Sequence, residues 1–298
     1  MLSNGEIKMK KFKLALYALL ALTLVGCSTN KVEKKALIAL AWKPGLGSES
    51  MNEVFSFLEK TGSDVIMLEK TTSSDLSYYE DGTLSDDYLN WDFSLNEEAV
   101  TILKGTENIN VDERINDVDL LIFLGGEDVS PSLYTEDFEL MDDPTYNPER
   151  DASDYLLMRY ALSNDIPTLG ICRGMQMMYV VNGGTLIQDL PPFLEELGEE
   201  DVYLHRSENG KKTFHSITIE DKELKKIIKS GIVSSSHHQA VSNELPNNVI
   251  PVAYTGHIIE AIKLKDHKNA LGVQFHPEYF NSPVMEKEGV ELIKSLIK

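Results

Sequence analysis

The chain has 298 residues, of which 42% are apolar and 26% are charged. This length and composition suit an ordinary globular enzyme of one large domain or two small ones, and they exclude wholesale disorder. Acidic residues number 48 against 28 basic ones, for a net charge of −20, so nucleic acid is a poor partner. With only two cysteines, a disulfide-dense scaffold and a four-cysteine zinc site are excluded as well.

The first 26 residues are predicted to form a lipoprotein signal peptide. Four lysines between positions 8 and 13 precede an apolar run, residues 14–25, which is too short to span a bilayer but suits a signal-peptide core. The run ends in Leu24-Val25-Gly26-Cys27, which resembles a bacterial lipobox. This resemblance implies that Cys27 is lipidated and becomes the first mature residue, and two or three acyl chains there give stable membrane anchoring.

An ordinary cleaved signal peptide and an uncleaved anchor are the alternatives to this interpretation. As a lipoprotein, the chain has a polar, lysine-rich tether over residues 27–35 and a folded domain over residues 36–298. We expect that domain outside the cytoplasm, held at the cell membrane by the lipid alone. Cys172 is then the only free thiol of an exported protein, so it is either buried as a small hydrophobe or chemically useful.

Strand and helix patterns alternate along the mature chain. Strands are predicted over residues 36–42, 64–68, 119–124, 166–171 and 271–275, and helices over residues 49–60, 151–162, 173–182 and 285–297. The acidic, aperiodic residues 71–96 predict a long surface loop or lid, and residues 202–265 have the short alternating runs typical of hairpins. The pattern predicts an α/β fold with a mainly parallel central sheet and appended antiparallel hairpins.

Cys172 lies where a predicted strand runs directly into a predicted helix. Gly170 and Gly174 flank it in the pattern G-x-C-x-G, the thiol form of a nucleophile elbow, and they permit close backbone approach at a sharp turn. The carboxyl end of a strand is where ligands bind in open α/β sheets, and a helix N-terminus favours the thiolate. We expect the N–H of Arg173 to point toward an oxyanion formed at Cys172.

A thiolate nucleophile needs a base, and the base needs a group that orients it. His276 ends an apolar strand, and Glu278 follows two residues later, so in an extended chain both side chains lie on one side. Glu278 can then accept from one imidazole nitrogen while the other nitrogen faces Cys172, as in a catalytic triad. Taken alone, the pair also fits a strand-end histidine near an unrelated glutamate. Solvated surface positions are expected for His205, His215, His257 and His267.

Several stretches of the chain resemble one enzyme family. G-I-C-R-G-M-Q at residues 170–176 and G-V-Q-F-H-P-E at residues 272–278 resemble class I glutamine amidotransferase-like domains. Residues 124–134, 182–190 and 236–241 resemble stretches of the gamma-glutamyl-gamma-aminobutyrate hydrolase branch, and all matches occur in family order. The resemblance implies a flavodoxin-like three-layer domain that cleaves gamma-glutamyl amides without a metal or an organic cofactor.

The resemblance also implies roles for individual residues. Cys172 is the nucleophile, His276 is the base and Glu278 is its orienting group. Gly126 matches the glycine whose N–H is the second oxyanion donor, beside that of Arg173. Four further residues match positions that line the substrate pocket: Gln176, Ser236, His237 and His238.

Some of these matches have plain structural interpretations. A hydrogen-bonded structural pair explains residues 237–238 equally well, and an ordinary strand-to-loop turn is the alternative for residues 125–126. We expect Asp128 and the pair at residues 150–151 to stabilise loops rather than to contact substrate. The acidic segment, residues 71–96, has no counterpart in the family, and its role cannot be deduced.

The predicted activity is hydrolysis of a gamma-glutamyl amide through a gamma-glutamyl thioester on Cys172. The partners expected are a small gamma-glutamyl substrate, the membrane through the lipid and a second copy in a homodimer. One alternative is a folate polyglutamate or peptide gamma-glutamyl hydrolase. A glutaminase subunit that passes ammonia to a synthetase is disfavoured because the lipid anchor separates it from cytosolic partners. A substrate-binding lipoprotein without activity is disfavoured by the intact Cys, His and Glu.

Overall fold

The computed structural model describes residues 34–45, 47–135 and 146–297. The predicted signal peptide, the lipidation residue Cys27 and most of the predicted tether lie outside these residues. The unit described below begins at Ala36. In the described part of the chain, no helix has the length and apolar character needed to cross a membrane.

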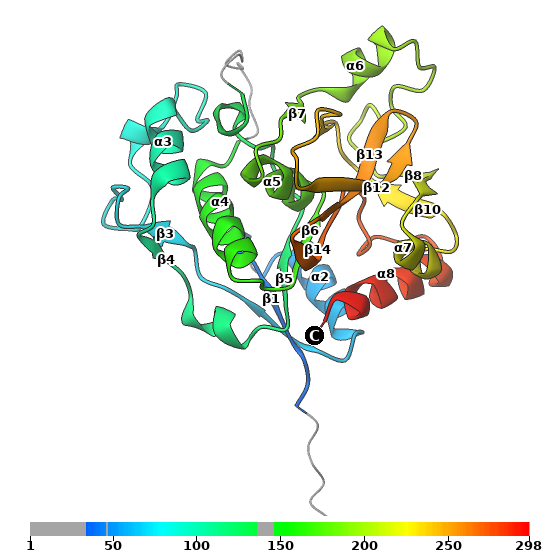
Figure 1. Cartoon of the computed structure of the whole chain (residues 1–298), viewed down its shortest axis with the longest axis horizontal. Helices are drawn as coiled ribbons and strands as arrows, with labels where there is room; N and C mark the ends of the chain where they lie inside the picture. Colours follow the sequence, from blue (N-terminus) through cyan, green and yellow to red (C-terminus); the bar gives the residue numbers. More distant parts are fainter. Residues whose placement is uncertain (1–33, 46, 136–145, 298) are drawn as a thin grey trace, which may run out of the picture. The chain divides into compact units, whose positions relative to one another are not determined.

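A mixed sheet of eight strands forms the centre of the described unit, in the order β2-β1-β5-β6-β14-β13-β12-β9 (Figure 1). The first five strands in this order run parallel, and the last three continue the sheet by antiparallel pairing. The predicted mainly parallel sheet with appended antiparallel hairpins is therefore confirmed. The strands are β1 (Leu37–Leu40), β2 (Asp64–Met67), β5 (Leu120–Phe123), β6 (Thr168–Ile171), β9 (Thr218–Ile219), β12 (Val249–Thr255), β13 (Ile258–Leu264) and β14 (His267–Val273).

Helices cover both faces of this sheet and give three layers. Figure 1 shows α4 and α5 on one side of the sheet and α2 and α8 on the other. The helices are α2 (Glu49–Glu59), α3 (Glu97–Gly105), α4 (Pro148–Ser163), α5 (Arg173–Val181), α6 (Leu190–Glu196), α7 (Lys222–Ile227) and α8 (Pro283–Leu296). Single 3₁₀ turns are η1 (Asp86–Tyr88), η2 (Glu113–Asp117) and η3 (Pro131–Leu133). Three small ladders pair β3 (Thr72–Ser73) with β4 (Ile109–Asn110), β7 (Leu186–Ile187) with β11 (Ala240–Val241), and β8 (Thr213–Ser216) with β10 (Ile232–Ser235).

Strand β5 shows why the central strands have continuous apolar sequences. Leu120 and Ile122 pack with α2 and α8 on one face, whereas Leu121 and Phe123 pack with α4 and α5 on the other. Because successive side chains of a strand point to opposite faces, a strand covered on both faces has no solvated positions. All four side chains are fully buried.

Helix α4 begins three residues before the predicted start. Asn147 caps it by accepting a hydrogen bond from the backbone N–H of Arg150, and Pro148 occupies the first helical position, where a missing N–H costs nothing. The first turns bury Arg150, Asp151 and Asp154. These buried charges interrupt the apolar pattern, so the periodicity of the sequence marks only the later part of the helix.

The expectation of a surface loop over residues 71–96 is partly wrong. The segment is mostly irregular, but Leu76, Leu84 and Leu95 belong to the buried core beside α4. The backbone N–H of Leu95 donates to Ser130 Oγ at 3.1 Å, which ties the segment to the loop after β5. Its apolar residues are spaced by turns rather than by a strand or helix period, so the sequence does not reveal their burial. Helix α3, which follows directly, was not predicted.

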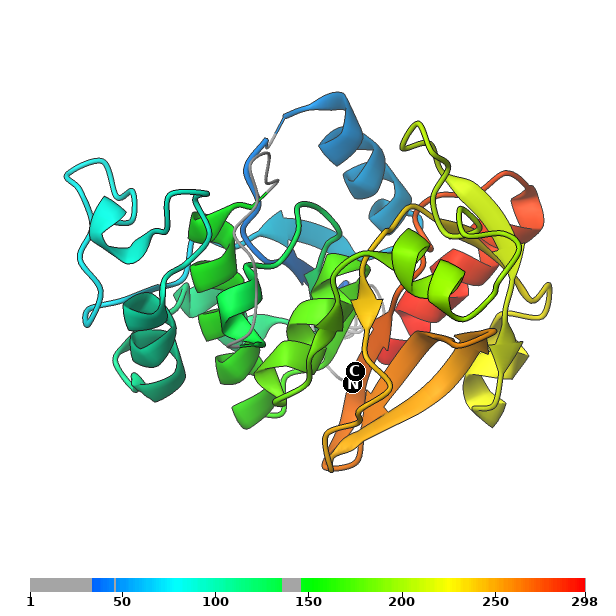
Figure 2. The ribbon, with the colours of Figure 1, turned by 90° about the horizontal axis from the view of Figure 1, so that it is seen from above.

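The antiparallel strands lie at the opposite end of the sheet from this acidic segment, as Figure 2 shows in orange and cyan. Strands β12 and β13 form a hairpin whose turn contains Gly256 at a positive φ of 54°. The sheet ends at β9, which has only two residues and is followed almost at once by α7. The hairpins predicted over residues 202–265 are present, and α7 lies among them unpredicted.

Candidate active site

Cys172 occupies a strained turn between β6 and α5. Its backbone has φ 52° and ψ −106°, a conformation that costs free energy for a residue with a side chain. The backbone N–H of Cys172 donates to the carbonyl of Val273 at 2.7 Å, which continues the parallel pairing of β6 with β14. This is the geometry of a nucleophile elbow, and the side chain is 6% exposed.

The two flanking glycines are required by backbone contacts. A Cβ atom on Gly170 would lie 2.5 Å from the backbone carbonyl of Gly174, and one on Gly174 would overlap the carbonyl oxygen of Phe123. Backbone atoms cannot move aside as a flexible side chain can. The G-x-C-x-G pattern therefore lets the first turn of α5 pack directly on β5 and β6.

His276 and Glu278 meet at the end of the chain segment that leaves β14. Nδ1 of His276 lies 2.7 Å from Oε1 of Glu278, and both residues are at most 9% exposed. Because an ionised carboxylate only accepts hydrogen bonds, Nδ1 carries the hydrogen. The backbone N–H of His276 donates to the carbonyl of Ser234 on β10 at 2.9 Å, which fixes the position of the ring.

The structure also brings His276 to Cys172. A Cβ atom on Gly125 would lie 2.8 Å from His276 Cε1 and 3.4 Å from Cys172 Cβ, so the two side chains lie next to each other. Burial disfavours the charged imidazole, but the neighbouring Glu278 carboxylate and Cys172 outweigh it and raise the pKa of His276 to about 10. His276 therefore holds its proton at neutral pH, beside the sulfur.

The loop after β5 presents Gly125 and Gly126 to the same place. Arg150 donates to the carbonyls of Leu124, at 2.6 Å, and Gly125, at 3.2 Å, and Lys43 donates to the Gly125 carbonyl at 2.6 Å. In a trans peptide the C=O and the following N–H point in opposite directions, so the Gly126 N–H points away from Arg150 and Lys43. A Cβ on Gly126 would overlap the Arg150 guanidinium, which explains the glycine.

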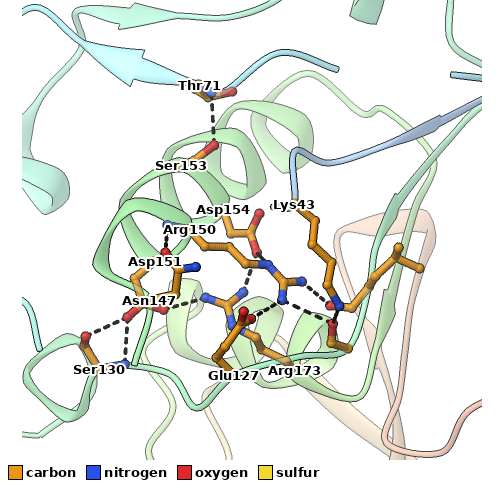
Figure 3. A network of polar contacts seen from close by, with 12 residues as sticks. Lys43, Thr71, Glu127, Ser130, Asn147, Arg150, Asp151, Ser153, Asp154 and Arg173 are labelled. Carbon is orange, nitrogen blue, oxygen red and sulfur yellow. Dashed lines mark hydrogen bonds and ion pairs between the residues drawn. The ribbon is translucent and has the colours of Figure 1, made fainter. Parts of the chain in front are cut away.

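A buried network of ion pairs lies beneath the elbow and this loop (Figure 3). The side chain of Arg173, the residue after the nucleophile, pairs with Asp151 and Asp154 of α4. Arg150 pairs with Asp154 at 3.4 Å and with Glu127 at 2.7 Å. The network ties the start of α5 and the loop after β5 to the same turn of α4. It agrees with the expectation that residues 150–151 stabilise loops.

A cavity of about 230 Å³ opens at Cys172. Its walls include the other two members of the predicted triad, the two loop glycines and Ser236. Lys43, Lys212 and Tyr279 also line it, and sequence reasoning did not single out any of the three. Burial, followed by the nearby Arg150, lowers the pKa of Lys43 to about 8.

Gln274 is a further residue that sequence reasoning missed. Its Nε2 donates to Cys172 Sγ at 3.5 Å, a normal distance for a hydrogen bond to sulfur. Gln274 lies within the G-V-Q-F-H-P-E stretch, so a signal was present in the sequence, although its contact with the sulfur was not evident. Lys43 and Lys212 had no such signal, because each lies on an irregular segment outside the matched stretches.

The four residues matched to the substrate pocket have different environments. Ser236 lines the cavity, whereas Gln176 donates to the Gln239 carbonyl at 3.1 Å and is 3% exposed. His237 is buried and its Nδ1 lies 2.9 Å from the same carbonyl. His238 contacts Asp128 at 3.1 Å. It also lines a separate hollow, together with His205 and His237. The structure thus brings one of the four to the catalytic cavity and leaves the other three outside its walls.

The expected surface positions of His205, His215 and His267 are wrong, because all three are at most 7% exposed. His205 and His215 contact the buried carboxylate of Glu260, and the pairing of distant segments that creates this environment cannot be inferred from the local sequence. His267 begins β14 and faces inward. The side chain of His257 is 59% exposed, as expected.

The sequence matches the family described as Peptidase C26 over residues 67–278. A glutamine amidotransferase-like protein of Rickettsia prowazekii is 31% identical over 240 residues, which cover 67% of this chain and 83% of that protein. The gamma-glutamyl-gamma-aminobutyrate hydrolase of Escherichia coli K12 is 30% identical over 170 residues, which cover 54% of this chain and 65% of that protein. A solved glutamine amidotransferase from Thermotoga maritima superposes with a TM-score of 0.45 at 16% identity, over 88% of this chain and 83% of that one.

Proposed function

The chain belongs to the peptidase C26 family, and from this membership we propose that it hydrolyses gamma-glutamyl amide bonds through a gamma-glutamyl thioester on Cys172. The observation that carries the proposal is the arrangement of Cys172, His276 and Glu278 at one cavity. A relative named gamma-glutamyl-gamma-aminobutyrate hydrolase supports the choice of bond. The chemistry is nucleophilic catalysis coupled to general acid–base catalysis.

In the first step, the Cys172 thiolate attacks the gamma-amide carbon and a C–S bond forms. The N–H groups of Gly126 and Arg173 stabilise the resulting oxyanion; removing one such donor typically costs roughly 10²–10³ in rate. Gln274 stabilises the negative sulfur before the attack by donating to it. Protonated His276 then transfers its proton to the amine nitrogen, and the C–N bond breaks.

In the second step, water attacks the thioester that remains on Cys172. His276, now neutral, accepts a proton from the water, and Glu278 stabilises the imidazolium that forms. The tetrahedral intermediate collapses, glutamate leaves and the thiolate returns. The raised pKa of His276 supports this cycle, because the first step needs the protonated imidazole.

An open cleft of about 870 Å³ adjoins the catalytic cavity. Its size and lining support a substrate whose leaving group carries a second polar group. Lys212, Glu278 and Tyr279 line both spaces, and Phe214 and Phe280 line the cleft alone. We propose that the amine product occupies this cleft, with the Lys212 ammonium near a carboxylate of the product. Gamma-aminobutyrate fits this description, and so does a glutamate of a folate polyglutamate or peptide.

Glutamate release by the full-length chain tests the function. The substrates are gamma-glutamyl-aminobutyrate, glutamine, glutathione and a gamma-glutamyl-glutamate peptide, and Cys172→Ala is the control. Selective release that depends on Cys172 is the expected result and identifies the leaving group. No release from any of the four by a folded protein would contradict the proposal and favour a substrate-binding lipoprotein. Rapid alkylation of Cys172, slowed by a gamma-glutamyl competitor, is the second readout.

We also propose that the protein is a lipoprotein held at the outer side of the cell membrane through Cys27. The lipobox-like sequence supports this location. Mass spectrometry of the N-terminal peptide should find acyl groups on Cys27, and Cys27→Ser should move the protein from the membrane to the soluble fraction. An unmodified Cys27 in membrane-bound protein would instead favour an uncleaved anchor.

A further inference from the structure

A second buried cluster of ionisable residues lies outside the walls of the catalytic cavity. It contains His205, His215 of β8, His237 after β10 and Glu260 of β13. None of the four is more than 6% exposed, and Glu260 is fully buried. The ring centroid of His205 lies 4.9 Å from that of His215 and 4.9 Å from that of His237. The cluster therefore joins parts of the chain that are far apart in sequence.

Hydrogen bonds at the rim of the cluster define which imidazole nitrogens carry hydrogen. Nδ1 of His237 lies 2.9 Å from the carbonyl of Gln239, which only accepts, so Nδ1 is the donor and Nε2 of the neutral ring carries a lone pair. Nδ1 of His215 lies 3.3 Å from both the carbonyl of Ser216 and the hydroxyl of Thr255. Because the Thr255 hydroxyl donates to the Ser216 carbonyl, Nδ1 of His215 is also a donor and its Nε2 carries a lone pair. Within the described residues, both Nε2 atoms are buried without a hydrogen-bond partner.

The lone pair of His215 faces the carboxylate of Glu260. Nε2 of His215 lies 3.6 Å and Nδ1 of His205 lies 3.2 Å from Oε1 of Glu260. Neither Glu260 oxygen has a hydrogen-bond partner that meets normal geometry in the described part of the chain. Buried acceptors that lack a well-aligned donor are costly. A cation among them would turn each acceptor into a ligand.

We propose that His205, His215 and Glu260 bind one divalent transition-metal ion of the zinc type, with His237 packed against the ring of His205 at the edge of the site. The ligand atoms of the first three residues all lie within 4.8 Å of one another. Around tetrahedral zinc, with bonds of about 2.0–2.2 Å, ligand atoms are about 3.4 Å apart. The separations of 3.2 and 3.6 Å from Glu260 fall on either side of that value.

The chemistry of the ligands selects the class of ion. Imidazole nitrogens suit zinc and its transition-metal neighbours, whereas calcium and magnesium prefer six or more oxygen ligands. The three ligand residues are buried, and His205 also lines a hollow of about 170 Å³, which leaves room for a further ligand. Ser236, which lines the catalytic cavity, directly precedes His237, so the ion would also fix that wall of the cavity. The proposal departs from the expectation, drawn from the family resemblance, that the protein holds no metal.

Metal analysis of the full-length chain, produced without a histidine tag, tests the proposal. The protein is stripped with a chelator and then titrated with zinc chloride in competition with a chromophoric chelator. About one ion per chain should bind, and cobalt(II) in its place should give the intense visible bands of tetrahedral coordination. A folded wild-type protein that takes up no stoichiometric zinc and shows no tetrahedral cobalt spectrum would overturn the proposal. A proton shared between His205 and Glu260 would then hold the cluster together.

Variants locate the ion. Glu260→Gln and His215→Gln should each weaken zinc binding by more than the roughly 10–100-fold that loss of an outer-shell partner costs. His267→Gln, which changes another buried histidine outside the cluster, should leave zinc affinity unchanged. Equal affinity in all three variants would contradict the assigned ligands. If the ligand variants do not fold, the wild-type cobalt spectrum decides. None of these readouts depends on glutamate release, so the hydrolase proposal fails or succeeds separately.

Discussion

The described part of the molecule contains two buried clusters of histidine and glutamate, and the chain assembles them in different ways. His276 and Glu278 are two residues apart and meet at 2.7 Å, beside a cavity that holds a nucleophile. His205 and Glu260 come from distant segments, are both buried and meet at 3.2 Å. The first cluster suits proton transfer, because one imidazole nitrogen faces the cavity. The second cluster, which protein surrounds, suits the linking of distant segments of the chain.

The largest expected effect separates the two clusters. Cys172→Ala should lower turnover by roughly 10⁴-fold or more, because removing a nucleophile removes the covalent route. The same variant should bind zinc as tightly as the wild type, because Cys172 lies outside the second cluster. Steady-state glutamate release and zinc titration measure the two effects. A change in zinc affinity would show that the clusters are coupled.

The second prediction concerns the network that supports the catalytic cluster. Asp151→Ala should destabilise the protein by about 3 kcal/mol or more, because Arg173 then loses one of its buried partners. Glu223→Ala, which breaks an exposed pair with Lys226, should change stability by less than about 1 kcal/mol. Urea unfolding at neutral pH gives both values. Similar losses in the two variants would mean that the buried network contributes no more than a surface pair.

The third prediction concerns the orienting carboxylate. Glu278→Gln should lower kcat by about 10²-fold, within the usual range for general acid–base catalysis, with a smaller change in KM. Steady-state kinetics on the preferred gamma-glutamyl substrate measure both constants. A higher KM with an unchanged kcat would indicate that Glu278 contacts substrate instead of orienting His276.

The same variant has a pH signature. The carboxylate raises the pKa of His276, so Glu278→Gln should move it down from about 10. Because the pKa of His276 is higher in the folded protein than the unfolded value of about 6.5, protonation of His276 adds to the free energy of unfolding, and this addition is complete below about pH 6.5. The addition is lost as the pH rises through the pKa of the folded protein. In the variant that pKa is lower, so the loss should occur at lower pH. NMR titration of the His276 ring and urea unfolding across pH 6–10 measure the shift, and an unchanged titration would refute it.

The smallest effect tests why the elbow is built from glycines. Gly174→Ala should cost roughly 1–3 kcal/mol, because the added Cβ overlaps the Phe123 carbonyl oxygen and the backbone must shift. Gly105→Ala, in the last turn of α3, meets no atom within 4 Å and should be neutral or stabilising by up to about 1 kcal/mol. Thermal or urea unfolding distinguishes them, and equal behaviour would remove packing as the reason for Gly174.

The comparison of the clusters also explains how far the sequence could be interpreted. The elbow and the His276–Glu278 pair were predictable because each is local: a strand ends, a turn follows, and the side chains lie within a few residues. The partnership of His215 with Glu260 depends on how β8 and β13 are placed, and no local pattern carries that information. Surface exposure, the default for an isolated histidine, was therefore the wrong expectation.

The same distinction applies to the fold: features set by neighbouring residues were predictable, and features set by contacts between distant segments were not. Strands buried on both faces were predictable from continuous apolar runs, as in residues 119–124. The first turns of α4 were not, because their charged side chains are buried through ion pairs with residues distant in sequence, Arg173 and Glu127. The packing of residues 71–96 was missed for a related reason. Their buried leucines contact a helix that lies much later in the chain.

The short strand β9 has a consequence for the behaviour of the protein at high concentration. An edge strand with many free N–H and C=O groups can recruit a strand from another molecule, which begins aggregation. At this edge the sheet presents Thr218–Ile219 and the short part of β12 that β9 does not pair, Val249–Pro251, where Pro251 has no N–H to donate. A neighbouring molecule therefore finds almost no ladder to extend there, and crowded copies of the protein should stay dispersed on that side.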